Sequence, residues 1–133
     1  MGDILVPISP GELLDKITIL RIKSSRLTDA AQRAHVELEL GLLLETWRAC
    51  GCEARSLPHE EQALERVNER LWDIEDRIRE KESARCFDAE FIELARSVYL
   101  ANDERAAIKK RINLHFRSRI VEEKSYRPYR GET

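Results

Sequence analysis

The chain has few of the residues that interrupt helices or cross-link a fold. It contains 5 glycines, 4 prolines and 3 cysteines among 133 residues. An odd number of cysteines without an export signal argues against a disulfide framework. Cys50 and Cys52, with Cys86 far away along the chain, also lack the paired spacing of structural zinc ligands. We therefore expect reduced thiols and no metal site.

Long hydrophobic runs are missing as well. No segment approaches the ~18 consecutive apolar residues of a membrane span. The first residues lack the basic region and apolar core of a signal peptide. These absences predict a soluble, cytoplasmic protein with no membrane partner. The balance of 42% hydrophobic and 36% charged residues is instead typical of long amphipathic helices.

Four amphipathic helices are predicted. Ser9 can cap the first, Pro10 fits its first position and Glu12 can complete a capping box. Gly51 can end the second helix, and Asp88 can cap the fourth. The expected helices cover about residues 10–27, 29–50, 58–85 and 89–116.

These helices predict an all-α, four-helix bundle-like fold in one domain over residues 1–133. The third and fourth should form a long antiparallel hairpin, because only a short connection joins them, and the first two should pack across it. Residues 1–9 are expected to be extended, and residues 117–133 to form a basic, tyrosine-containing tail. A short strand over 119–122 could pair with 4–6.

The second helix carries apolar residues on two sides. Leu38 and Leu42 lie on one side, and the other side holds Val36, Leu40, Leu43, Leu44 and Trp47. A helix with two apolar sides is either central in the fold or part of an oligomer interface. We therefore expect a homodimer.

Three polar residues interrupt the apolar stripe of the fourth helix. Asn102, Arg105 and Lys109 are spaced three and four apart, so they share a face with the apolar residues Phe91, Val98, Ile112 and Phe116. Burying a guanidinium and an ammonium is costly without partners. These residues are therefore either locked into an internal network or placed to bind an anion.

The third helix offers internal partners. Asn68, Glu75 and Glu82 are seven residues apart on the shoulder of its apolar stripe. If the fourth helix is antiparallel, one or both glutamates could face Arg105 or Lys109. We favour this internal network, because buried polar groups in bundles are usually satisfied within the protein.

An anion site between the helices is the alternative. Arg105 would donate two hydrogen bonds to a phosphate or carboxylate, Lys109 would add positive charge and Asn102 would orient the ligand. Arg21 of the first helix lies at the edge of its apolar face and could close such a pocket, together with the tail residues Arg127 and Arg130.

Carboxylates could also hold Mg²⁺ between facing helices, as in all-helical nucleotide pyrophosphatases. Glu12 and Asp15, three apart on the first helix, would then act with acids of the third. Asp73 and Asp76 lie on the outer side of the third helix, which argues against a joint site. The acid/base or metal candidates under this alternative are Glu12, Asp15, Glu75 and Glu82.

Charge is divided unevenly along the chain. Residues 1–104 hold 14 Lys/Arg against 22 Asp/Glu, a net of −8, whereas residues 105–130 hold nine against two, a net of +7. This asymmetry favours an anionic partner, or pairing of the two regions within the fold or an oligomer. A basic, tyrosine-containing end could contact nucleic acid, but the overall charge of −2 argues against it.

Four stretches together carry a family resemblance: LVPISPGELLDKITIL at 5–20, LWDIEDRI at 71–78, ANDERAAIK at 101–109 and VEEKSY at 121–126. They resemble a small bacterial family known only as a domain of unknown function. The likeness spans most of the chain and is weakest around 51–60. It implies one complete domain including both ends, and it implies no catalytic residue.

We therefore expect a non-catalytic cytoplasmic binding or interaction module. The competing hypothesis is an enzyme or sensor for a small phosphorylated or carboxylated ligand, bound between the third and fourth helices, in which Mg²⁺ could take part.

Overall fold

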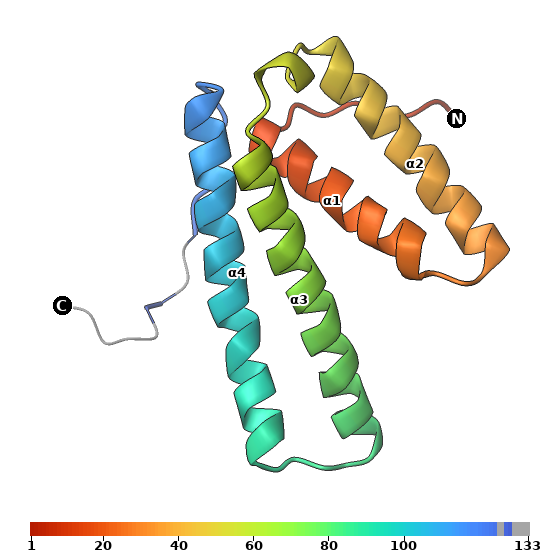
Figure 1. Ribbon diagram of the computed structural model, residues 1–133, viewed down its shortest axis with the longest axis vertical. Helices are drawn as coiled ribbons and strands as arrows, with labels where there is room; N and C mark the ends of the chain where they lie inside the picture. Colours follow the sequence, from red (N-terminus) through yellow and green to blue (C-terminus); the bar gives the residue numbers. More distant parts are fainter. Residues whose placement is uncertain (125–126, 129–133) are drawn as a thin grey trace.

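Four α-helices dominate the computed structural model, which describes residues 1–124 and 127–128 (Figure 1). A short 3-10 helix, η1, precedes the third of them. The elements are α1 Pro10–Arg26, α2 Ala30–Ala49, η1 Glu53–Arg55, α3 Pro58–Ser83 and α4 Ala89–His115. The predicted all-α class and the four predicted helices are confirmed.

The helix ends follow from local side-chain chemistry. Ser9 Oγ accepts a hydrogen bond from the Glu12 amide at 3.1 Å, and Asp88 does the same for the first turn of α4. Gly51 ends α2 at a φ of 79°, which few other residues adopt. Glu12 does not complete the predicted capping box, because its carboxylate accepts a hydrogen bond from Lys109 at 2.6 Å instead.

The helices are not arranged as four equivalent members of a bundle. α3 and α4 form the predicted antiparallel hairpin and make the most extensive contact in the fold. α1 crosses one half of this hairpin, and α2 lies on the far side of α1 (Figure 1). The prediction that α2 packs across the hairpin was wrong, and of the two alternatives for its apolar sides the central position is excluded. α2 reaches the α4 end only near its own C-terminus, where the Trp47 and Phe116 rings meet edge to face at 5.6 Å.

The core lies where α1 crosses the hairpin. Its centre consists of side chains from α1, α3 and α4 that have almost no exposed surface: Ile17, Leu64, Val67, Ile108 and Ile112. Burial of this apolar surface is the main force that holds the three helices together. The half of the hairpin beyond α1 contributes far less to this core (Figure 1).

The two end segments do not pair with one another. Ile4, Leu5 and Val6 are exposed, and the described residues contain no strand. The predicted pairing of 119–122 with 4–6 was therefore wrong. The C-terminal segment instead follows α4, because Lys124 forms an ion pair with Asp103 at 2.6 Å and other contacts hold the residues before it.

A buried lysine closes the turn between α3 and α4. The ammonium of Lys81 contacts Asp88 at 2.9 Å and Glu90 at 3.1 Å. The hydrogen bond from Lys81, together with the Phe91 amide, lowers the pKa of Asp88 to about 2.

No helix in the described part of the chain is long and apolar enough to cross a membrane.

Candidate functional site

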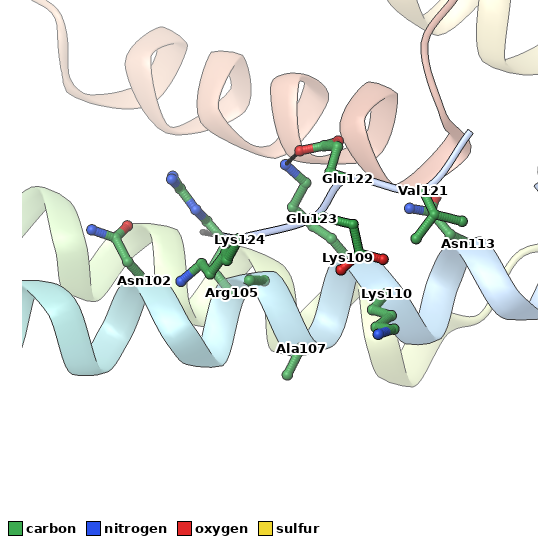
Figure 2. Close-up of a pocket in the computed structure, with 11 residues that line it drawn as sticks. Asn102, Arg105, Ala107, Lys109, Lys110, Asn113, Val121, Glu122, Glu123 and Lys124 are labelled. Carbon is green, nitrogen blue, oxygen red and sulfur yellow. Dashed lines mark hydrogen bonds and ion pairs between the residues drawn. The ribbon is translucent and has the colours of Figure 1, made fainter. Parts of the chain in front are cut away.

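Lys109 is the centre of an ionic cluster between α1, α4 and the C-terminal segment. Its ammonium lies 2.6 Å from Glu12, 3.2 Å from Glu122 and 3.8 Å from Asp15, and only 13% of its side chain is exposed. Figure 2 shows Glu122 meeting the end of Lys109 above α4, while Lys110 points to the other side. Three carboxylates thus surround one cation.

A buried polar network continues from this cluster into the core. The Asn68 amide of α3 donates to Asp15 Oδ1 and to Thr18 Oγ1, both at 2.9 Å. Thr18 in turn donates to the backbone carbonyl of Asp15 at 2.8 Å. Among the described residues, no buried side-chain nitrogen or oxygen lacks a hydrogen-bond partner. The network therefore links α1 to α3 and leaves none of its polar side-chain atoms without a hydrogen-bond partner.

The charges of this cluster shift the ionisation of its members. Burial alone would raise the pKa of Glu12, but the hydrogen bond and charge of Lys109 outweigh it and hold the pKa below its ordinary value. Burial alone would lower the pKa of Lys109, but Glu12 and Asp15 raise it. Both groups are therefore charged at neutral pH, and the positive charge of Lys109 is matched within the protein.

Arg105, one turn before Lys109, has a different environment. Its half-buried guanidinium has a single long contact of 3.5 Å, to Asn68 Oδ1. Within the described part of the chain, no carboxylate lies within 4.0 Å of it. A guanidinium presents five donors and keeps its charge. Arg105 therefore retains donor capacity that the described residues leave unused.

Two cavities meet at Arg105. The larger, of about 620 Å³, lies between α4 and the C-terminal segment (Figure 2). The smaller, of about 380 Å³, lies between α1, α3 and α4, with Trp72 and Glu75 among its walls. Arg105 and Asn102 line both. Small-ligand sites in proteins are cavities of this size with a few polar groups that converge on them.

The predicted polar stripe is thus brought together, and of its predicted partners on α3, Asn68 contacts Arg105 but Glu75 and Glu82 do not pair with the stripe. Asn102, Arg105 and Lys109 all line the larger cavity from one side of α4. Glu75 lines the smaller cavity and forms its ion pair with Arg79 at 3.7 Å, and Glu82 is exposed and lines neither cavity. The acids that satisfy Lys109 come from α1 and the C-terminal segment, because α1 crosses the hairpin at the level of Lys109.

The remaining candidates lie elsewhere or have other roles. Arg21 is exposed, lines neither cavity and acts electrostatically on Glu61 of α3. Arg127 is also exposed, and Arg130 lies outside the described residues. Glu12 and Asp15 face Lys109 rather than acids of α3. The residues that the structure describes contain no group of three or more His, Cys, Asp or Glu side chains placed to hold a metal ion.

The cysteines do not add a nucleophile to this region. All three are free thiols, and Cys50 is exposed. Burial, and then the neighbouring Cys50, raises the pKa of Cys52 to about 12. A thiol with such a pKa is protonated at neutral pH and is a weak nucleophile.

Three residues of the site escaped the sequence analysis. Thr18 and Asn113 are buried polar residues on otherwise apolar helix faces, a signal that could have marked them. Asn113 Oδ1 accepts the Gly11 amide at 2.7 Å and so fixes the start of α1 against α4. Glu122 carried no such signal, because only the path of the C-terminal segment brings it to Lys109.

A model of a family of unknown function, DUF6165, matches residues 4–130. The match covers the four helices and most of the C-terminal segment, which agrees with the resemblance in the sequence. Comparison with curated proteins and with solved structures finds no match.

Proposed function

The chain belongs to the family of unknown function DUF6165, and from that premise we propose that it is a non-catalytic binding module whose ligand-facing group is the Arg105 guanidinium. We place this module in the cytoplasm, as the composition predicts. The ligand is a small molecule that carries a phosphate or carboxylate group.

The unmatched charge of Arg105 carries this proposal. Lys109 is surrounded by three carboxylates, whereas the described residues give Arg105 only an amide contact at 3.5 Å. A bidentate oxyanion is the group that best matches the donor geometry of a guanidinium. Binding one would satisfy Arg105 without disturbing the ion pairs of Lys109.

The walls of the larger cavity suit such a ligand. They carry four cationic side chains, of Arg105, Lys109, Lys110 and Lys124, but Lys109 and Lys124 are each already paired with a carboxylate at 2.6 Å. The positive charge that an anion meets near this helix face is therefore chiefly that of Arg105. Asn102 can orient a neighbouring polar group of the ligand, because its amide offers both donors and an acceptor.

A second candidate function is an enzyme or sensor that uses the smaller cavity. Glu75 and Arg105 both line it, so a carboxylate and a guanidinium could act on one phosphorylated or carboxylated molecule between α3 and α4. Mg²⁺ could assist Glu75 in this case. An enzyme would turn the ligand over, which neither a sensor nor the binding module does.

Thermal unfolding of the full chain with millimolar phosphate, citrate, nucleotides or sugar phosphates tests the proposal. A ligand that stabilises the folded state raises Tm by several degrees at a concentration near a hundred times its Kd. We expect at least one of these probes to do so for the wild type, and Arg105→Gln to abolish the rise. Without ligand, the Tm of Arg105→Gln should hold or increase, since ligand-binding groups are often kept at a cost in stability.

Two variants separate ligand binding from a structural role. Arg111→Gln changes an arginine of α4 that is already paired with Glu60 at 3.1 Å, and it should keep the ligand response. Lys109→Met should lose several degrees of Tm without ligand, because it removes the counter-charge of Glu12 and of the buried Asp15. If Arg105→Gln behaved like Lys109→Met and no probe stabilised the wild type, Arg105 would be structural. Consumption of a stabilising probe would favour the enzyme.

A further inference from the structure

α2 has an outer face that nothing in the described chain covers. Its inner face packs on α1 through partly buried leucines and the buried Trp47. Figure 1 shows α2 at the edge of the molecule, with α1 between it and α3. On the opposite face, Leu38 is 66% exposed and Leu42 is 46% exposed. A monomer therefore leaves two large apolar side chains of this helix in water.

The residues along this outer face follow a coiled-coil repeat. Six exposed positions are separated alternately by four and three residues, the spacing that keeps a seam on one side of a helix. They are Ala31, His35, Leu38, Leu42, Glu45 and Ala49. The seam is about 27 Å long at 1.5 Å per residue.

This seam is complementary to itself when read in the opposite direction. If two copies cross about a two-fold axis between Leu38 and Leu42, Leu38 meets the partner's Leu42 and Ala31 meets the partner's Ala49. His35 then meets the partner's Glu45, and the symmetry repeats each contact. A parallel arrangement would instead place Glu45 against the partner's Glu45. The charges thus favour the antiparallel pairing.

Gly41, beside the seam, is a second and independent observation. Glycine in the middle of a helix is destabilising relative to alanine. A Cβ atom on Gly41 would meet nothing within 4 Å, so the fold of one copy does not require the missing side chain. A second helix that crosses at this point would require the side chain to be missing, because glycine lets two backbones approach closely.

We propose that the outer face of α2 is the interface of a homodimer in which the two α2 helices pack antiparallel, with leucines at the centre and a His35–Glu45 pair on either side. A second copy of this chain fits better than an unrelated partner, because one face supplies both members of each pair. The interface is separate from Arg105 and does not depend on ligand binding.

Analytical ultracentrifugation of the full chain, at protein concentrations from about 1 to 200 µM, measures the oligomeric state and so tests the interface. We expect the wild type to form dimers in this range and Leu38→Gln to weaken the dimer at least tenfold. Leu114→Gln is a matched control, because Leu114 of α4 is also a leucine with 66% exposure. It should leave the dimer Kd within about twofold. A monomeric wild type at 200 µM, or equal effects of the two variants, would overturn the proposal.

Charge reversal tests the antiparallel register. His35→Glu places two carboxylates opposite one another, and Glu45→Lys places an ammonium opposite a histidine, so each variant should weaken the dimer. The double variant should restore the affinity, since the introduced carboxylate of one copy would then face the introduced ammonium of the other. Circular dichroism and Tm establish that each variant is folded. If the double variant is no tighter than the singles, the register is wrong.

Discussion

Two cations one turn apart on the same helix face have opposite environments. Lys109 is enclosed by Glu12, Asp15 and Glu122. Within the part of the chain that the structure describes, Arg105 reaches only Asn68. The difference arises from where α1 crosses α4, because the acids of α1 lie beside Lys109. Similar residues in one stripe therefore serve different purposes: Lys109 holds three segments together, and Arg105 faces open cavities.

The Glu12–Lys109 pair predicts how stability depends on pH. The pKa of Glu12 is lowered in the folded state, so its contribution is fully present above the ordinary value of 4.5 and is lost as pH falls through the folded-state pKa. At pH 7, we expect Glu12→Gln to cost about 1.5–3 kcal/mol of unfolding free energy, the usual contribution of a hydrogen bond to a charged group. Urea unfolding between pH 7 and 3 measures the difference from the wild type, which should shrink toward pH 3.

The control for this experiment is Glu39→Gln. Glu39 is an exposed glutamate of α2 with no ion pair among the described residues. It should change the unfolding free energy by less than about 0.5 kcal/mol at every pH. A difference between Glu12→Gln and the wild type that stays constant down to pH 3 would contradict the assigned role of Glu12.

At the scale of elements, the start of α1 docks directly on α4. The Gly11 amide donates to Asn113 Oδ1 at 2.7 Å, and a Cβ atom at Gly11 would lie 2.7 Å from the backbone oxygen of Lys109. Such a distance is a severe overlap. The absence of a side chain at position 11 therefore sets how closely α1 approaches α4, and with it the position of Glu12 and Asp15 beside Lys109.

Gly11→Ala tests this docking. Overpacking of a tight contact typically costs about 1–3 kcal/mol, and we expect a loss of unfolding free energy in that range despite the better helix propensity of alanine. Chemical denaturation measures the loss. Gly2→Ala, which meets nothing within 4 Å, should be neutral. Equal stabilities of the two variants would show that α1 can shift away from α4 without cost.

The whole molecule is a long hairpin that α1 covers on one half only, with α2 on the outer side of α1 (Figure 1). The acidic part of the chain and its basic C-terminal region meet within the fold, as the charge asymmetry allowed. Lys109 pairs with Glu12, and Arg111 pairs with Glu60. At the C-terminal end of α1, Arg26 forms an ion pair with Asp73 of α3 at 2.5 Å. Beyond that point no other helix of the described residues lies beside α3 and α4 (Figure 1).

This architecture predicts a gradient of local stability along the hairpin. Amides of residues 78–84 and 92–96 should exchange with solvent at least tenfold faster than those of 64–71 and 105–112, because α1 packs only on the second group. Native-state hydrogen exchange measures the rates residue by residue. The Lys81 cluster at the turn opposes fraying, so the fastest rates should lie between the turn and α1. Uniform protection would contradict the gradient.

Most of the secondary structure could be predicted from the sequence, because its determinants are local. Ser9, Asp88 and Gly51 act on backbone groups within a few residues, and the apolar periodicity reports which helix face is buried. The same periodicity identified Asn102, Arg105 and Lys109 as one group. The partners of Lys109 could not be predicted, because they depend on how α1 lies across the hairpin.

Local patterns in the chain were enough to specify four helices, their ends, the α3–α4 hairpin and the polar stripe of α4. The packing of the helices was needed to establish that α1 and not α3 supplies the acids for Lys109, that α2 lies at the edge and that Arg105 faces cavities. Helix formation depends on interactions between residues a turn apart. The crossing of α1 depends on the shape of distant surfaces, above all on the space that Gly11 leaves beside α4.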